Sequence, residues 1–499
     1  MNRRYFLNMF DASPLLANLS IPRLPHSEPL ATTTIDPIWH VLNRTSFGPT
    51  PGQVEAVRKT GLANYLALQL DPIRIGDELS DGYVNQYMTL TMSVTQMLKL
   101  DETFSIQIKE LEAATVLRAV YSRRQLFEVL CLFWSEHFSI LHFKEQDKYL
   151  KTIDDRTVIR KHALGNFRDL LGASAHSPAM LVYLDNAWSH KDHPNENYAR
   201  ELMELHTLGV GNYSEQDVLE VARCFTGWSI LGEHNYDPGG FVFVREMHDN
   251  GSKTVLGHDI PAGGGVRDGE MVLDLLAAHP MTAHAIATKL CRRFISDDPP
   301  AAAISAAQQA FSSSGGAIPS VLMAIFNTPE FTNAAPKFKR PFEYLISILR
   351  ALDTHIDNNK VFVYSSNKDK SIPTLLSTLT TLGHMPFNHP TPEGYSDNGE
   401  LWEQNMLLRW NAALDIVQGS LAGVTSNLQA LIKGQGIASN AAVVVAFFAQ
   451  HLYGRALTDS ESALFMGYLN AADFKTTQGQ QRLAETIGLM LAAPAFQWR

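Results

Sequence analysis

A spacing of three and four residues between apolar side chains runs through most of the segments between residues 36 and 230. Two examples are TFSIQIKELEAATVLRAVYS, residues 103–122, and RRQLFEVLCLFWSEHF, residues 123–138. Because an α-helix turns once every 3.6 residues, this spacing places the apolar side chains on one face of a helix. Residues 267–350 and 402–499 show the same pattern. The sequence therefore predicts a mainly all-α protein, a multi-helical globular array of helical hairpins.

Two segments depart from helical periodicity. Residues 231–266 are rich in glycine and alternate on a period of two around Phe241 to Arg245, which predicts a small β-hairpin or extended insertion near 235–260. Residues 355–400 contain Pro, Gly and aromatic residues without a period, which predicts a long ordered loop. We expect a main helical domain at 35–350 and, at 351–499, this loop with a C-terminal helical subdomain packed on the first.

Charge and cysteine content exclude several classes of protein. The 499 residues include 41 Lys and Arg against 51 Asp and Glu, which gives a net charge of −10. No long basic run is present, so nucleic acid is not expected as a partner. The three cysteines, Cys131, Cys224 and Cys291, lie in apolar helical patterns without C-x-x-C spacing, so we expect buried free thiols rather than disulfides or a zinc knuckle.

The first 34 residues are expected to form a leader or an extended segment. Arg3 and Arg4 precede Tyr-Phe-Leu and resemble a twin-arginine export signal, but Asp11 and Pro14 interrupt the apolar segment that should follow. A periplasmic or extracellular location and a soluble cytoplasmic one both stay open. The longest uncharged apolar run, residues 441–449, is too short to cross a bilayer, which takes roughly 18 residues or more, so no transmembrane segment is expected.

The stretch HPNENYARELMELHTLGVGNY, residues 193–213, groups its charges unusually closely. At 100° per residue, Asn197, Arg200, Glu201 and Glu204 share about a third of the helix circumference, whereas His206 points nearly the opposite way. Arg200 can pair with Glu204 at i, i+4. A solvated, ion-paired face and an inward-facing acidic stripe both fit this pattern, and an inward stripe would need partners because buried carboxylates are costly.

Other segments supply polar and aromatic residues that could face this helix. Each of them also has a structural interpretation, as a core aromatic, a helix cap or a turn residue. We expect acid, base or nucleophilic roles, or their support, from Asp185, Glu196, Arg200, Glu201 and Glu204. We expect substrate contacts from Trp134, Asn197, Trp228, His248, Asp249 and Lys253. If a divalent or transition metal is bound, the candidate ligands are His137, Glu201, Glu204 and His248.

The motifs of several common enzyme classes are missing from the sequence. It contains no G-x-S-x-G, no G-x-x-x-x-G-K-[ST], no H-E-x-x-H and no dinucleotide-binding fingerprint. Carboxylate and histidine chemistry remains. Three hypotheses follow: a carboxylate-based hydrolase or lyase acting on an extracellular polymer such as a polysaccharide, a metal-binding protein with or without redox activity, or a non-enzymatic envelope scaffold.

Nine blocks of sequence are considered together. They are LNRTSFGPTPGQV, FWSEHF, NFRDLLGASAHSPAMLVYLDN, PNENYARELMELHTLGV, DVLEVARCFTGW, HDNGSKTVLG, KLCRRFISDDPP, KRPFEYLISILRAL and PTPEGY. In this order they resemble one bacterial family, which is catalogued as domain of unknown function eighteen hundred. The resemblance covers the chain from about residue 35 to the C-terminus and implies a mostly helical, exported or envelope-associated protein, without implying an activity. In FWSEHF, Glu136 stands where the family is expected to carry an amide or another neutral polar residue.

Overall fold

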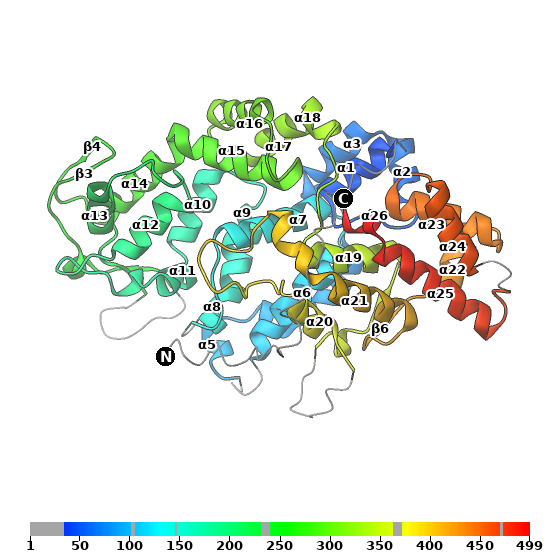
Figure 1. Cartoon of the computed structure of the whole chain (residues 1–499). Helices are drawn as coiled ribbons and strands as arrows, with labels where there is room; N and C mark the ends of the chain where they lie inside the picture. Colours follow the sequence, from blue (N-terminus) through cyan, green and yellow to red (C-terminus); the bar gives the residue numbers. More distant parts are fainter. Residues whose placement is uncertain (1–33, 101–104, 145–146, 231–239, 363–371, 470–472) are drawn as a thin grey trace, which may run out of the picture. The chain divides into compact units, whose positions relative to one another are not determined.

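Helices make up most of the computed structural model, which describes residues 34–499 apart from 101–104, 145–146, 231–239, 363–371 and 470–472 (Figure 1). Residues 35–499 form one compact unit by their contacts. The leader expected at residues 1–34 lies outside the described residues except for Thr34. The prediction of a mainly all-α fold is confirmed.

The helices of the first half begin at residues that suit helix N-termini. Asn195 caps α12 by accepting a hydrogen bond from the Tyr198 N–H, and Ser214 and Asp217 form a capping box at the start of α13. Pro37 and Pro178 occupy the first positions of α1 and α11, where a missing N–H costs nothing. The bounds are α1 Pro37–Thr45, α2 Gln53–Thr60, α3 Leu62–Gln69, α4 Glu78–Val84, α5 Val94–Met97, α6 Ile106–Tyr121, α7 Gln125–His137, α8 Asp147–Asp154, α9 Arg160–His162, α10 Phe167–Ala175, α11 Pro178–Tyr183, α12 Glu196–Glu204 and α13 Glu215–Cys224.

Three short antiparallel strand pairs interrupt the helices. Strand β1 (Trp228–Ser229) pairs with β2 (Val242–Phe243), and β3 (Lys253–Val255) pairs with β4 (His258–Ile260). These two pairs confirm the β insertion predicted near 235–260, of which residues 231–239 lie outside the described part. A third pair, β5 (His355–Ile356) with β6 (Val424–Thr425), joins segments that are distant in sequence.

The helices of the second half surround α19, the only long helix of the described chain in which every residue is buried. A helix that is apolar around most of its circumference belongs in a core. It packs against α6 on one side and against α20 and α21 on others. The bounds are α14 Val266–Ala278, α15 Pro280–Phe294, α16 Ala301–Ser314, α17 Ile318–Phe326, α18 Pro329–Thr332, α19 Pro341–Ala351, α20 Leu375–Thr381, α21 Met406–Gln418, α22 Leu428–Gly434, α23 Ala441–Tyr453, α24 Asp459–Leu469, α25 Thr477–Ala492 and α26 Pro494–Gln497.

The long loop predicted at 355–400 contains a helix, α20, so that prediction is corrected in part. Thr374 caps α20 through a capping box with Ser377, and Leu375, Leu376 and Leu379 are buried on one face. The helix has only two turns and is rich in Thr and Ser, so its apolar period is too short to stand out in the sequence. Residues 385–398 lack a helix or strand, as expected.

None of the described helices combines the length and the apolar character that a bilayer crossing requires. The apolar run at 441–449 lies within α23, which has 13 residues. All three cysteines are buried and free, as predicted.

Candidate functional site

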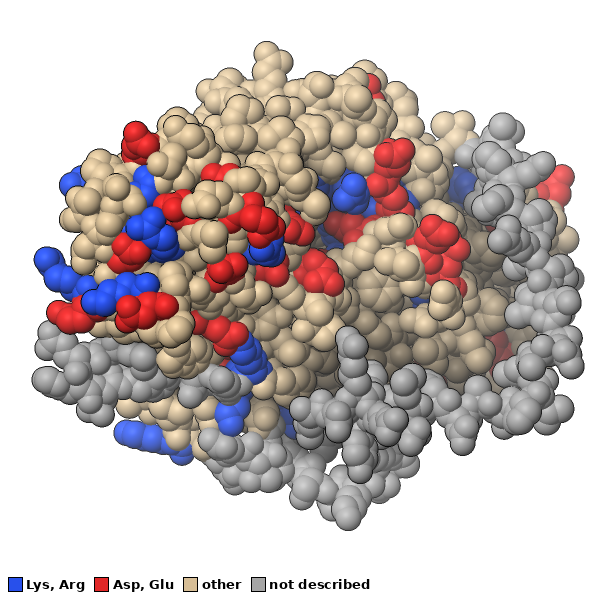
Figure 2. All heavy atoms as spheres, turned by 60° about the vertical axis from the view of Figure 1, so that its left-hand side comes forward, with Lys and Arg blue, Asp and Glu red and all other residues tan. Residues whose placement is uncertain are grey.

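Helix α12 presents a mixed face rather than a uniformly inward stripe. Tyr198, Ala199, Leu202 and Met203 pack into the core, while Glu196 and Asn197 are exposed. Arg200, Glu201 and Glu204 lie between these extremes and are half-buried. Acidic and basic side chains are mixed over the face that α12, α13 and the β3–β4 hairpin form (Figure 2).

Arg200 and Glu204 do not pair with each other, contrary to the i, i+4 pairing considered from the sequence. Arg200 instead forms two hydrogen bonds with Glu215 at the start of α13, at 2.9 and 2.6 Å. Glu204 accepts a hydrogen bond from the Tyr213 hydroxyl. Because Glu215 follows the turn that reverses the chain after α12, it reaches Arg200 from the neighbouring helix. The pair is open to solvent and contributes little to stability.

Glu201 forms no ion pair with a lysine or arginine of the described residues, and unlike the exposed Glu196 it is half-buried. Its carboxyl group is half-buried, and burial raises its pKa above the ordinary value. The negative charges of Glu204 and Glu393 raise that pKa further, and the positive charge of Arg200 lowers it. Glu393 lies in residues 391–399, so this loop acts on α12 electrostatically although the two are far apart in sequence. A carboxyl group with a raised pKa is suited to donating a proton.

A cavity of about 440 Å³ opens next to the C-terminal end of α12. Its wall comes from the end of α7, from α15 and from the loop that carries Glu393. Two hydrogen bonds join this wall to the chain just after α12. Lys289 Nζ donates to the Leu205 carbonyl at 2.8 Å, and His137 Nε2 lies 3.2 Å from the His206 carbonyl. The lining residues are Phe133, Glu136, His137, Lys289, Arg292, Asp297, Glu393, Gly394, Tyr395, Ser396, Asp397 and Asn398.

His137 and Lys289 form a polar pair in this wall. The Nζ atom of Lys289 lies 3.0 Å from Nδ1 of His137. Burial and the neighbouring ammonium hold the pKa of His137 well below its usual range, so the ring is neutral. Because the Lys289 ammonium can only donate, the Nδ1 atom of His137 accepts its hydrogen bond. The proton of the neutral His137 ring is therefore on Nε2, which donates to the His206 carbonyl. Burial also lowers the pKa of Lys289, to about 8.

Glu136 anchors the cavity floor. It accepts from Arg340 Nη1 at 2.6 Å and from His384 Nε2 at 3.1 Å, and both of those partners are buried. Glu136 is the position at which the chain departs from the expected family pattern, and here the negative charge matches a buried arginine. A further group of ion pairs below it joins Glu343 to Arg293 and to Arg499.

Gly394 ties the loop 391–399 to this floor. Its φ angle is +71°, a region that favours glycine, and a Cβ atom there would overlap the carbonyl oxygen of Glu136. At the far end of the loop, the Gly399 N–H donates to Asp297 at 2.8 Å. The loop that brings Glu393 to α12 is therefore held at two points.

None of the predicted catalytic residues lines the cavity, a set made up of Asp185, Glu196, Arg200, Glu201 and Glu204. Asp185 is exposed, adopts a left-handed conformation with φ of 62°, and pairs with Lys144 at 2.7 Å. Glu201 is related to the cavity through Glu393, which does line it and whose charge acts on the Glu201 carboxyl group.

Both predicted aromatic platforms are inside the core. Trp134 and Trp228 are each 0% exposed, so their ring faces are not open to a sugar ring. The Trp134 indole donates to the Ala163 carbonyl at 3.0 Å, and the Trp228 ring packs against Phe225 and Phe241. These burials favour the core interpretation of both residues over the binding interpretation.

His248, Asp249 and Lys253 belong to a separate, satisfied cluster. His248 and Lys253 both contact the buried Asp268, at 3.2 and 2.5 Å. Asp249 accepts from the Gly251 N–H at 2.8 Å, which is the Asx turn considered from the sequence, and it also pairs with Arg223. No lining residue of the cavity beside α12 comes from this cluster.

His137, Glu201, Glu204 and His248 do not form a common metal-binding group. Across the part of the chain that the structure describes, no three or more His, Cys, Asp or Glu side chains are arranged to hold a metal ion. The Nδ1 atom of His137 already accepts from Lys289, and His248 lies in the Asp268 cluster.

Sequence analysis missed Glu393, Lys289 and Tyr395. Glu393 and Tyr395 occur in PTPEGY, a block used only for the family resemblance. A carboxylate beside Pro and Gly in a long aperiodic loop is a recognisable signal, because binding and catalytic residues often lie on loops that a rigid scaffold positions. The sequence around Lys289 does not indicate a functional role, because this lysine fits the regular helical pattern of α15.

Comparison with protein families gave one match, to the family described as "Protein of unknown function (DUF1800)", over residues 40–498. Comparison with curated proteins and with solved structures gave no match.

Proposed function

The chain belongs to the family described as protein of unknown function, DUF1800, and from the geometry of its own residues we propose that it is a carboxylate-based hydrolase or lyase acting on a polysaccharide. Glu201 is the proton donor and Glu393 the base or nucleophile. One observation carries the proposal: Glu201 is half-buried, lacks an ion-pair partner among the described residues, and lies near enough for the charge of Glu393, which lines a cavity of about 440 Å³, to raise its pKa.

The environments of the two carboxyl groups support different roles. Burial and two neighbouring negative charges favour the protonated form of Glu201, which can then protonate a leaving group. Glu393 is exposed and forms no ion pair with the described residues, so it is free to meet substrate. Pairs of carboxyl groups with separated proton affinities are the usual arrangement in enzymes that cleave glycosidic bonds.

The cavity supplies further groups that suit a hydroxyl-rich substrate. Tyr395 and Asn398 offer hydrogen-bonding groups, and Lys289 offers a cation. A volume of about 440 Å³ falls within the roughly 300–1,000 Å³ of ordinary ligand sites.

The test compares Glu201→Gln and Glu393→Gln with wild type on a panel of polysaccharides, measuring new reducing ends and unsaturated sugar products. Each substitution is expected to lower turnover by at least about 100-fold, the scale of acid–base catalysis. The matched control is Glu196→Gln, on the exposed face of the same helix, which should keep full activity. Wild-type activity that both variants retain contradicts the assignment.

Stability measurements separate catalysis from a structural role. Because Glu201 has no ion-pair partner and faces two other carboxylates, Glu201→Gln should be at least as stable as wild type at pH 7. A scaffold role for this residue predicts early melting instead. A folded, inactive Glu201→Gln protein supports the proposed function.

We also propose that the protein acts outside the cytoplasm, because residues 3–7 resemble a twin-arginine signal. Residues 1–34 fused to a reporter that works only in the periplasm test this. Export that is lost when Arg3 and Arg4 are both changed to Lys supports the proposal, whereas a reporter that stays inside the cell contradicts it.

A further inference from the structure

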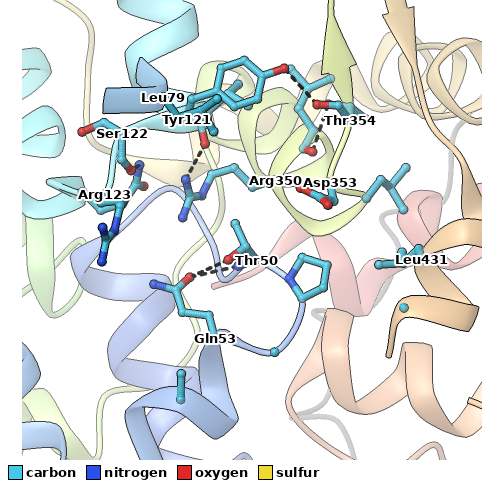
Figure 3. Close-up of a pocket in the computed structure, with 18 of the residues that line it drawn as sticks. Thr50, Gln53, Leu79, Tyr121, Ser122, Arg123, Arg350, Asp353, Thr354 and Leu431 are labelled. Atoms are coloured by element: carbon cyan, nitrogen blue, oxygen red, sulfur yellow. Dashed lines mark hydrogen bonds between the residues drawn. The ribbon is translucent and has the colours of Figure 1, made fainter. Parts of the chain in front are cut away.

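A second and larger cavity, of about 770 Å³, lies away from the proposed acid–base residues (Figure 3). Helices α2, α3 and α22 contribute to its wall, together with the C-terminal ends of α6 and α19. None of the residues of the cavity beside α12 lines it. It is therefore a separate site with its own chemistry.

Arg350 is a buried cation in the wall of this cavity without a carboxylate partner. Its side chain donates from Nε to the Gly48 carbonyl and from Nη1 to the Val120 carbonyl, each at 2.6 Å. Its other terminal nitrogen, Nη2, makes no hydrogen bond to the described residues. Arg350 is only 4% exposed.

Two other buried arginines of the described chain have carboxylate partners: Arg293 pairs with Glu343, and Arg340 pairs with Glu136. Arg44 and Arg409 are buried without an ion pair and, like Arg350, bond backbone carbonyl groups, but neither of them lines this cavity. A buried charge is costly unless an opposite charge or a ligand compensates it. Arg350 has carbonyl dipoles alone, so an anion entering the cavity would supply the missing partner.

Arg123 adds a second cation to the same cavity. Its backbone N–H donates to Asp77 at 2.6 Å, which fixes the start of the side chain, while its guanidinium makes no hydrogen bond to the described residues. Among the lining residues, Asp353 is the sole carboxylate. Figure 3 shows Arg123, Arg350 and Asp353 around one open space, with Thr50 and Gln53 on its other side. The charged side chains of the lining therefore sum to +1, whereas the whole chain carries a net charge of −10.

The rest of the wall mixes polar and apolar side chains. Leu68, Ile75, Leu79 and Leu431 all contribute to it. Leu79 is 60% exposed and Leu68 is 40% exposed, so two of these lining leucines have apolar surface that a ligand can cover. A ligand that covers these side chains would gain the free energy of apolar burial.

We propose that this cavity binds an aliphatic monocarboxylate, with its carboxylate at Arg350 and Arg123 and its chain along the leucines. Arginine holds carboxylates through charge-assisted hydrogen bonds, and such bonds are stronger where solvent is excluded. A single carboxylate matches the surplus of one positive charge in the lining. Asp353 opposes the anion and disfavours ligands that carry more than one negative charge.

The experiment measures binding of sodium octanoate to the full chain by isothermal titration calorimetry. Octanamide, which has the same chain without the charge, should bind at least about tenfold more weakly, and butanoate should also bind more weakly because it covers less apolar surface. Equal binding of octanoate and octanamide, or no octanoate binding at millimolar concentration, overturns the proposal.

Three variants locate the binding. Arg123→Gln should weaken octanoate about tenfold, and Asp353→Asn should tighten it, because the first removes an attraction and the second a repulsion. Asparagine suits the left-handed backbone of Asp353, whose φ is 48°. Arg350→Lys keeps the charge but loses the guanidinium and should weaken binding further.

Arg350→Lys can also disturb folding, because Arg350 bonds two carbonyl groups. If Arg350→Lys does not fold, the octanoate affinities of Arg123→Gln and Asp353→Asn decide, because both of these residues are exposed. Octanoate affinity that neither of them changes places the ligand elsewhere and overturns the proposal. The polysaccharide activity of Arg123→Gln should equal that of wild type. A failure of the carboxylate-binding proposal is therefore distinguishable from a failure of the proposed acid–base function.

Discussion

The Nζ atom of Lys289 lies 3.0 Å from Nδ1 of His137, and because the ammonium can only donate, Nδ1 accepts in this contact. His137 is neutral and uses Nε2–H to hold the chain just after α12. Lys289 bonds the Leu205 carbonyl in the same turn. Two side chains from α7 and α15 therefore fix the end of the helix that carries Glu201.

The first prediction concerns the acidity of Lys289. Burial lowers its pKa to about 8, so its amine should become reactive more than two pH units earlier than an ordinary lysine, whose pKa is about 10.4. Brief acetylation at a series of pH values, followed by mass spectrometry of the peptide, gives the midpoint for Lys289. The exposed Lys59 serves as an internal standard for the reagent. A midpoint above pH 10 contradicts the lowered pKa.

The second prediction concerns the loop that carries Glu393. Gly394→Ala places a Cβ atom against the Glu136 carbonyl in a left-handed conformation, so we expect a loss of at least about 2 kcal/mol in the free energy of unfolding and a loss of activity. Urea denaturation measures the first effect.

Gly467→Ala is the matched control for this substitution. Gly467 lies inside α24 with open space around its Cα, so alanine there should stabilise the protein by up to about 1 kcal/mol. Equal effects at Gly394 and Gly467 would show that the loop is not held as described.

The third prediction concerns the buried Lys253–Asp268 pair, in which Nζ and Oδ2 are 2.5 Å apart and both side chains are at most 1% exposed. Asp268→Asn leaves the ammonium of Lys253 buried without its anion, which should cost about 3–5 kcal/mol of stability. Adding Lys253→Met to this variant should recover part of the loss, because the uncompensated charge is then gone. Thermal and urea unfolding of both variants measure these changes, and a double variant less stable than Asp268→Asn contradicts the explanation.

The helical class was predictable because helix formation depends on residues three and four positions apart, which the sequence displays directly. Helix α20 was missed because two turns rich in Thr and Ser carry too little of that pattern. The burial of Trp134 and Trp228 in the core was not predictable from the sequence, because it depends on contacts with residues of other elements, such as Ala163 and Phe241.

Only part of the candidate site was predicted from the sequence. Glu201 could be selected because its helix groups several charges within two turns. The surroundings of its helix could not be selected, because Glu393 and Lys289 come near the end of α12 through the packing of a loop and of α15, and no local period records such tertiary contacts.

The last prediction concerns Glu112 on α6, whose carboxyl group is buried 3.7 Å from Nε2 of His142. Burial raises the pKa of Glu112 to about 8 and lowers that of His142 to about 4, so near pH 7 the two groups are mainly uncharged and do not form an ion pair. Between the ordinary glutamate pKa of 4.5 and about 8, the unfolded chain has lost this proton while the native protein keeps it. The native state therefore binds more protons than the unfolded state, so the contribution of Glu112 to the free energy of unfolding falls as the pH rises through this window.

Glu112→Gln removes that titration, and the variant should therefore gain stability relative to wild type as the pH rises from 5 to 8, by a few kcal/mol in total at about 1.4 kcal/mol per unit of pKa shift. Urea unfolding of both proteins at pH 5, 6, 7 and 8 measures the difference. Glu196→Gln, an exposed substitution of the same type, corrects for the general effect of losing one carboxyl group. A difference that stays constant across the four pH values means that Glu112 is ionised in the native protein and contradicts the raised pKa.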